Sequence, residues 1–332
     1  MRKFIGIILT LSLLLALQAC GINNVSTLKN EFVSLVQTDG DKSYLNVFDL
    51  ITGELVFEKK LGNADDYFYG MCDVGKDYNI ISYNTNEIYE ITNKGVSKLA
   101  TINRNIVFSA MYKEKLLVIN YDNSEKLHIS VYDIGDMNNP IAEKKLDGKF
   151  SDCKLVADKG EFFITTYSID DKFTSLYVFN LIDNSLFEKE LFNYATAAKV
   201  TAYNKSYWIA VGEKLINTTK KVELNKIFKY TYEDDIDEFA QCSKNPFIIN
   251  SDANNIYYIE DKNNPHLYVI NKNTGKPEFD FSLSVQEIYG LKVVNNNIYI
   301  IGSNKIYNLK NGKLKLIIRT KYDNIRAFND IF

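Results

Sequence analysis

The sequence predicts an all-β chain built from one repeated unit of four strands. Residues 44–61, YLNVFDLITGELVFEKKL, alternate in side-chain character on both sides of Thr52-Gly53, the pattern of two strands joined by a tight turn. Similar hairpins recur along the chain in units of about 36 to 49 residues. Aromatic residues make up 13% of the 332 residues, which favours strands over helices. A four-strand unit repeated at this period is typical of a β-propeller.

The first residues predict export and lipid attachment. A short basic start, Met1-Arg2-Lys3, precedes an apolar run of about 14 residues, which is too short to span a bilayer comfortably. Leu17-Gln18-Ala19-Cys20 then resembles the bacterial lipobox. The resemblance implies a signal peptide at 1–19, cleavage before Cys20 and acylation, including palmitate, of this cysteine. An ordinary signal peptide with an incidental cysteine and a signal-anchor helix are the alternatives.

The resemblance also implies a compartment. Gly21 is not Asp, so in a cell with two membranes the lipoprotein rule would place the protein at the outer membrane. We therefore expect a lipid-anchored body on the extracytoplasmic side of a cell membrane. Residues 20–31 are expected to be the lipidated cysteine and its tether, of which ten extended residues span at most about 35 Å. The propeller is expected to occupy residues 32–332.

The repeats divide into seven units whose strands are lettered A to D from the inside outward. The first unit has only B, C and D, at 32–37, 44–50 and 55–61. The second to fourth units are expected at 68–102, 106–146 and 151–192. The fifth has A to D at 198–203, 207–211, 214–217 and 222–230, followed by a long acidic loop. The sixth and seventh are expected at 246–283 and 288–319.

The last residues predict how the ring closes. Residues 324–330, NIRAFND, read as an A strand with no B, C or D after it, whereas the first unit lacks an A strand. The C-terminal strand is therefore expected to pair with 32–37, which removes sheet edges that would invite aggregation. This arrangement predicts seven blades, with six or eight as alternatives because the fifth and sixth units have loose boundaries.

Three segments carry a fold-level resemblance. YLNVFDLITGELVFEKKL, SLYVFNLIDNSLFEKEL and HLYVINKNTGKPEFDF resemble C and D strands of the YVTN, WD-repeat and quinoprotein-like propeller superfamily. The tryptophan that ends quinoprotein repeats is replaced here by Phe57, Phe187 or Phe279, and the WD dipeptide is missing. The resemblance therefore implies the fold and neither quinone binding nor one family. Propellers include enzymes, receptors and scaffolds, so the fold alone gives no function.

Composition and motifs narrow the chemistry. A net charge of −3 argues against nucleic-acid binding through bulk charge. The two histidines, His128 and His266, fall at C-strand starts of different units, with no partners for a metal site or a catalytic triad. Three cysteines remain after Cys20, and we expect buried free thiols. No phosphate or calcium loop motif occurs, so no cofactor, metal or catalytic residue is assigned.

Charged loop residues are expected to divide between two faces. In a propeller the B–C and D–A loops share one face, and the A–B and C–D loops share the other. The first face is expected to be acidic: Asp39, Asp41, Asp65, Asp66, Asp122, Asp170, Asp171, Glu233, Asp234, Asp235, Asp237, Glu238, Asp261 and Asp323. The second face is expected to be basic: Lys76, Lys94, Lys113, Lys115, Lys159, Lys205, Lys220, Lys221, Lys272, Lys276, Lys310 and Lys313.

These assignments predict an orientation and a binding face. Because the chain enters and ends on the basic side, that side is expected to look toward anionic lipid and the acidic side outward. Carboxylates beside aromatic rings suit glycans, cationic peptides or an envelope protein. The candidate contact residues on the outward face are Asp65, Asp66, Tyr67, Asp170, Asp171, Tyr194, Tyr232, Asp234, Asp235, Asp237 and Tyr322.

The sequence therefore predicts a non-enzymatic binding or scaffolding lipoprotein. Its expected partners are the membrane, through the anchor, and an envelope protein, peptide or glycan. One alternative is an extracytoplasmic enzyme of the glycan lyase, hydrolase or lactonase type that uses carboxylates at the propeller mouth. Another is an envelope-assembly factor similar to the quinoprotein-like assembly lipoproteins.

Overall fold

The computed structural model describes residues 32–63, 68–74, 77–82, 86–92, 95–102, 105–156, 160–203, 206–231, 236–285, 287–294, 297–322 and 324–328. The predicted signal peptide, Cys20 and the tether lie outside this part of the chain.

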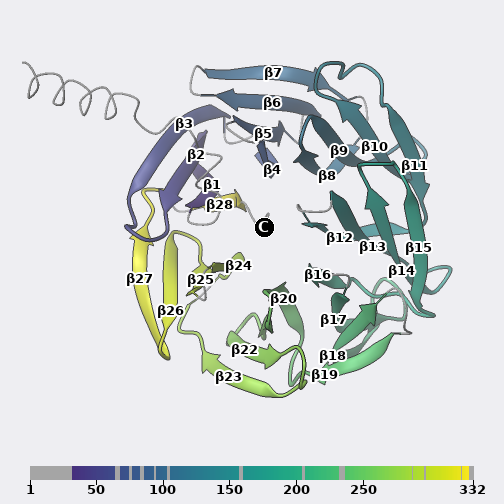
Figure 1. The fold of residues 1–332 in the computed structure, drawn as a ribbon, viewed down its shortest axis with the longest axis vertical. Helices are drawn as coiled ribbons and strands as arrows, with labels where there is room; N and C mark the ends of the chain where they lie inside the picture. The colour runs from purple at the N-terminus through teal and green to yellow at the C-terminus, as the bar shows by residue number, and fades with distance from the viewer. Residues whose placement is uncertain are drawn as a thin grey trace, which may run out of the picture.

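The described residues form seven four-stranded antiparallel sheets arranged as blades around one centre (Figure 1). The first sheet contains β28 (Asn324–Phe328), β1 (Phe32–Asp39), β2 (Lys42–Asp49) and β3 (Leu55–Asn63). The second contains β4 (Phe68–Val74), β5 (Asp77–Ser82), β6 (Glu87–Thr92) and β7 (Gly95–Thr101). The third contains β8 (Asn105–Tyr112), β9 (Lys115–Tyr121), β10 (Leu127–Asp133) and β11 (Ala142–Leu146). The fourth contains β12 (Lys149–Val156), β13 (Glu161–Ser168), β14 (Phe173–Asn180) and β15 (Leu186–Phe192).

The remaining three sheets follow the same order from the centre outward. The fifth contains β16 (Lys199–Tyr203), β17 (Ser206–Leu215), β18 (Lys221–Thr231) and β19 (Asp237–Gln241). The sixth contains β20 (Pro246–Ser251), β21 (Asn255–Glu260), β22 (His266–Asn271) and β23 (Pro277–Ser282). The seventh contains β24 (Gly290–Val294), β25 (Asn297–Ile301), β26 (Lys305–Lys310) and β27 (Lys313–Arg319).

The C-terminal strand closes the ring, as the sequence predicts. Strand β28 pairs antiparallel with β1, with Leu35 opposite Phe328 and Thr38 opposite Asn324. Inner strands of successive sheets contact one another from β28 through β4, β8, β12, β16 and β20 to β24. A shared core of side chains, including Leu35 and Ile301, then joins the seventh sheet to the first. The first and last described strands therefore complete one sheet.

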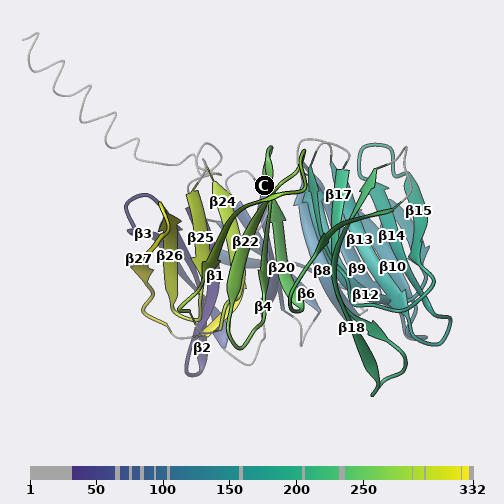
Figure 2. The same cartoon turned by 90° about the horizontal axis from the view of Figure 1, so that it is seen from below.

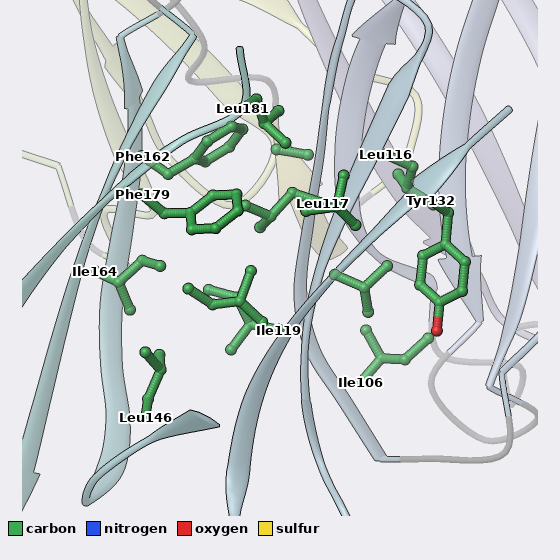
Figure 3. Packing of buried hydrophobic residues seen from close by; sticks show 14 of the residues in the cluster. Ile106, Leu116, Leu117, Ile119, Tyr132, Leu146, Phe162, Ile164, Phe179 and Leu181 are labelled. Carbon is green, nitrogen blue, oxygen red and sulfur yellow. The ribbon is translucent and has the colours of Figure 1, made fainter. Parts of the chain in front are cut away.

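Apolar side chains fill the space between neighbouring blades. In β14 the six central residues are buried, because both faces of a blade are covered, whereas the first five residues of the outer strand β15 are exposed or partly exposed. Figure 3 shows Phe162 and Phe179 of the fourth sheet directed toward Leu117 and Ile119 of the third. Burying one such side chain contributes about 1.5–3 kcal/mol. This packing explains the near-continuous apolar runs of the second and third strands of each unit.

A polar residue at the end of several C strands fixes the turn that follows. Asp49 Oδ1 accepts hydrogen bonds from the backbone N–H groups of Ile51 and Thr52 at 2.7 and 2.9 Å. Asn180 and Asn271 cap the equivalent turns of the fourth and sixth sheets in the same way. These residues recur in the hairpins that predicted the repeat, so the resemblance among them reflects turn geometry.

The fifth sheet differs from the prediction. Residues 214–217 are not a separate strand, because β17 continues through Gly212 to Leu215 and β18 is the C strand. Gly212 sits where the β17–β18 register shifts, and an added Cβ would meet the side chain of Asn245 at 1.8 Å. The glycine at this bulge interrupts the alternation of side chains in the sequence, and the interruption resembles a turn between two strands. The D strand is β19, after the acidic segment instead of before it.

The two faces of the disc follow from this topology. The terminal face is defined as the side where β1 begins, β28 ends, and the A–B and C–D connections lie. The opposite face carries the B–C and D–A connections. Figure 2 shows the disc edge-on, with the β1–β2 and β17–β18 hairpins projecting from its lower side, which is the opposite face.

A buried lysine joins the fifth and sixth blades. Lys272, in the β22–β23 turn, lies with its Nζ 4.2 and 4.3 Å from the ring centroids of Tyr203 and Trp208. The same Nζ donates a hydrogen bond to the backbone carbonyl of Asp252. Burial lowers the pKa of Lys272 to about 8, and the nearby Asp252 charge opposes this shift. The aromatic rings replace part of the water that the ammonium group loses.

This lysine predicts a pH-dependent stability. The folded protein releases the Lys272 proton near pH 8, whereas the unfolded chain holds it to its ordinary pKa of 10.5, so unfolding takes up a proton between these values. Relative to Lys272→Met, the free energy of unfolding of the wild type should therefore rise with pH, by about 1–2 kcal/mol between pH 7 and 10 once solvent screening is allowed for. Urea unfolding at several pH values measures this difference.

The control for this prediction is Lys276→Met, which changes an exposed lysine of the same turn. Its stability difference from the wild type should be the same at every pH in this range. If the stability difference between Lys272→Met and the wild type also stayed constant with pH, Lys272 would bind its proton as tightly in the folded protein as in the unfolded chain.

Candidate ligand-binding cleft

The structure does not bring together all five of the predicted contact residues that it describes. Asp170 and Asp171 lie in the β13–β14 turn on the opposite face, where the sequence places them. Asp65, Asp66, Tyr67, Tyr232, Asp234 and Asp235 lie outside the described residues. Asp237 is the first residue of β19 and pairs with Lys229, which places it on the terminal face. The prediction that Asp237 belongs to the outward face is therefore wrong, because the fifth sheet was divided incorrectly.

The predicted charge map fails in the fifth sheet for the same reason. Glu238, beside Asp237, lies toward the terminal face and pairs with Lys226 at 2.5 Å. Lys220 and Lys221 lie in and after the β17–β18 turn, on the opposite face that was predicted to be acidic. Lys272 is buried instead of facing lipid. The predicted division into one acidic and one basic face therefore does not hold for these residues.

Carboxylates on the opposite face mainly stabilise their own loops. Asp122 Oδ1 accepts from the N–H groups of Ser124 and Lys126 at 2.8 and 2.9 Å, and Asp171 accepts from the Ser168 hydroxyl at 2.8 Å. The Lys126 bond, with help from His128, holds the pKa of Asp122 below its usual value. Such turn caps need no ligand to account for them.

The two described aromatic candidates pack within the fold. Tyr322 is 3% exposed and stacks on Tyr44 with ring centroids 4.4 Å apart. Tyr194 is half-buried and stacks on Phe192, and burial raises its pKa to about 12. Neither forms an aromatic mouth, so the interpretation of Tyr322 as a contact residue is wrong.

A cleft of about 610 Å³ lies on the opposite face between the sixth and seventh blades. Its walls are the β21–β22, β23–β24 and β25–β26 connections. Leu283 N–H donates to Pro265 O at 2.8 Å, and Gly302 N–H donates to Lys305 O at 2.8 Å, so backbone bonds fix two of the walls. Buried Leu283 and Val285 contribute apolar surface to its lining.

Neutral polar groups dominate the accessible lining of this cleft. They are Asn263, Asn264, Ser284, Ser303 and Asn304. Amides and hydroxyls both donate and accept hydrogen bonds, and Tyr307 adds one aromatic ring. Glu287 and Lys305 supply one charge of each sign. This combination suits an uncharged polar ligand, such as a sugar or a peptide backbone. Sequence reasoning missed the cleft because it followed charge and aromatic clusters.

The histidines and thiols are not among the residues that line the cleft, although His266 directly follows the lining residue Pro265. His128, half-buried in β10, contacts Asp122 at 3.0 Å and Glu143 at 3.1 Å, and His266 contacts Asp280 at 3.2 Å. Cys242 is a buried free thiol whose pKa burial and the nearby Glu260 raise to about 12. Cys153 is only half-buried, contrary to expectation.

The residues that the structure describes contain neither a metal-binding cluster nor a membrane-spanning helix. Among them, no three or more His, Cys, Asp or Glu side chains are grouped so as to hold a metal ion. Within the same residues, no helix has the length and apolar character needed to cross a membrane.

The fold defines the chain as a β-propeller. No protein-family model and no curated protein matches it. Among solved structures, it is similar to a protein of unknown function from Desulfotomaculum acetoxidans, with a TM-score of 0.65 and 11% identity over 90% of this chain and 98% of that one. It is also similar to apo AztD from Citrobacter koseri, with a TM-score of 0.57 and 11% identity over 90% and 98% of the two chains.

A third similar structure is the β-propeller domain of the Trilobed protease from Pyrococcus furiosus. The TM-score is 0.57, with 12% identity over 88% of this chain and 93% of that one. That domain is described as having an open velcro topology, whereas β28 and β1 pair here. At these identities the likeness concerns the fold alone.

Proposed function

We propose that the protein is an extracytoplasmic lipoprotein whose seven-bladed propeller binds a polar ligand or an envelope partner in the cleft between the sixth and seventh blades. The proposal is supported by one spatial relation. The cleft lies on the opposite face, whereas β1 begins and β28 ends on the terminal face. An acyl anchor at Cys20 would leave the cleft directed away from the lipid.

The composition of the cleft supports binding over catalysis. Its lining consists mainly of amides and hydroxyls, with one carboxylate and one ammonium group. These groups recognise a ligand through directional hydrogen bonds, at a smaller desolvation cost than charged groups. A glycan or an extended peptide segment of an envelope protein fits this chemistry.

Ser284→Arg should test the cleft directly. Ser284 is exposed at its lining, so the arginine should obstruct the cleft and weaken partner binding at least about tenfold without altering the fold. The protein is incubated with solubilised envelope proteins and with cell-wall glycan fragments, and captured species are identified and titrated. Metal content is measured in the same sample, since a stoichiometric metal would favour the enzyme alternative.

Ser124→Arg provides the matched control. Ser124 is an exposed serine in the β9–β10 turn of the third blade, on the same face but away from the cleft. The Ser124→Arg variant should bind the partner as tightly as the wild type does. Both variants should have the same midpoint of urea unfolding as the wild type. Equal binding by Ser284→Arg and Ser124→Arg would reject the cleft as the binding site.

A further inference from the structure

Three exposed apolar side chains gather on the terminal face at the seam of the first and seventh blades. Ile51, Leu55 and Val56 are 65, 48 and 50% exposed. They belong to the β2–β3 turn and the first residues of β3, and they are called the seam patch here. Figure 1 shows β3 and β27 next to each other on the outer rim of the disc.

The turn that carries the seam patch is held rigidly. Asp49 caps it through the N–H groups of Ile51 and Thr52. Gly53 has φ +78°, and a Cβ there would lie 2.6 Å from the carbonyl oxygen of Ile317 in β27. The turn therefore packs directly on the seventh blade, which presents Ile51 to solvent in a fixed position.

Exposed lysines lie in the β26–β27 hairpin of the seventh blade, the blade on which the turn packs. Lys310 ends β26, and Lys313 and Lys315 lie in the first half of β27. The ion pairs of the described ranges include none of these three lysines. Exposed apolar side chains, together with lysines that form no ion pair within the described residues, match the chemistry of an anionic bilayer surface, where acyl chains and phosphate groups lie close together.

The chain itself places this patch near the predicted anchor. Phe32 pairs with Asp49, so the first described residue lies next to the turn that carries Ile51. Cys20 precedes Phe32 by twelve residues, which span at most about 42 Å when extended. A lipid on Cys20 would hold the seam patch within reach of the bilayer.

We infer that the seam patch and Lys310, Lys313 and Lys315 dock on an anionic lipid bilayer, so that the disc contacts the membrane at the rim of its first and seventh blades. This extends the proposed function, because it assigns a second membrane contact besides the anchor. The disc then stands tilted, with the seam at the membrane and the far rim raised.

The test uses Ile51→Trp in the full-length protein purified from membranes. Trp208 is the one native tryptophan and is 2% exposed, so a new tryptophan reports on its own position. On vesicles that contain phosphatidylglycerol, the Ile51→Trp signal should shift to the blue and be quenched by brominated acyl chains. Ile216→Trp, at a 40% exposed site in the β17–β18 hairpin on the opposite face, should show neither change.

A charge variant tests the lysines separately. Lys310→Gln, Lys313→Gln and Lys315→Gln together should lower partitioning of the protein onto phosphatidylglycerol vesicles about tenfold or more, and raised salt should have a similar effect on the parent. Lys145→Gln, Lys189→Gln and Lys244→Gln remove the same charge elsewhere and should have little effect.

The outcomes separate the patch from the anchor. Mass spectrometry of Cys20 shows whether the chain carries lipid. In the Ile51→Trp variant, an unquenched new tryptophan on vesicle-bound protein would overturn the patch even if Cys20 is acylated. Quenching of the same tryptophan in a chain without lipid would support the patch and reject the anchor. Emission from this variant that is already blue-shifted without vesicles, together with dimers in sedimentation, would overturn the inference by showing that a second copy covers the patch.

Discussion

Truncation after residue 323 should destabilise the protein by more than about 5 kcal/mol, which is comparable to the whole stability of many domains. The deletion removes β28, and β1 then loses its inner partner. Its backbone N–H and C=O groups become an open sheet edge, and β4 loses the inner strand that it contacts in the first blade. We expect an early melting transition and oligomers in size-exclusion chromatography.

Addition of a peptide tests whether the loss is specific. A synthetic peptide of residues 324–332 should restore the melting temperature in a concentration-dependent way, because it binds the folded ring and not the unfolded chain. A chain that ends at residue 328 keeps β28 and should melt close to the full-length protein. Equal melting of all three chains would contradict a stabilising role for ring closure.

Local patterns predicted the repeat well because the alternating strands and the turn residues of each hairpin are visible within a short stretch of sequence. Alternation around Thr52-Gly53 was read correctly, since Gly53 adopts a positive φ and Asp49 caps the turn. The unpaired segment at 324–330 was also assigned correctly, because a strand without a partner at one end matched a unit missing its inner strand at the other. Both inferences needed only short-range sequence and the requirement that edges be paired.

The fifth sheet shows where local patterns mislead. Glycine is typical of turns, but Gly212 lies at a bulge inside a long strand, where it packs against the side chain of Asn245. Because residues 214–217 were predicted to be a separate strand, Asp237 and Lys220 were predicted to lie on the wrong faces. The cleft was unpredictable for a related reason: residues from Asn263 to Tyr307 meet there only because the sixth and seventh blades pack side by side. Neutral amides and hydroxyls form no recognisable motif in the sequence.

A second large effect is expected at a buried glutamine in the closing blade. Gln37 is 0% exposed, and its Nε2 donates to Thr320 Oγ1 at 2.8 Å and to the carbonyl oxygen of Tyr322 at 2.9 Å. Its Oε1 accepts from Asn46 Nδ2 at 3.0 Å. These bonds attach the β27–β28 connection to β1 and β2. The network therefore secures the segment that delivers the closing strand.

Gln37→Ala should lower the free energy of unfolding by about 3 kcal/mol. The change leaves the amide of Asn46 without its acceptor and the Tyr322 carbonyl without one donor in a place that water does not reach, and each such loss costs about 1–3 kcal/mol. It also opens a cavity beside β28. Urea unfolding measures the loss, with the m-value expected to stay constant.

Gln241→Ala makes the same chemical change at an exposed position in the fifth blade. Its Nε2 bonds the carbonyl oxygens of Leu224, Asn225 and Cys242, and water can replace the amide there, so the expected loss is below about 1 kcal/mol. Because Gln37 acts through the closing strand, its cost should also shrink in the chain that ends at residue 323. Thr320 and Tyr322 remain in that truncated chain, so a full cost there would mean that Gln37 holds residues 320–322 whether or not β28 follows, and that it has no part in closing the ring.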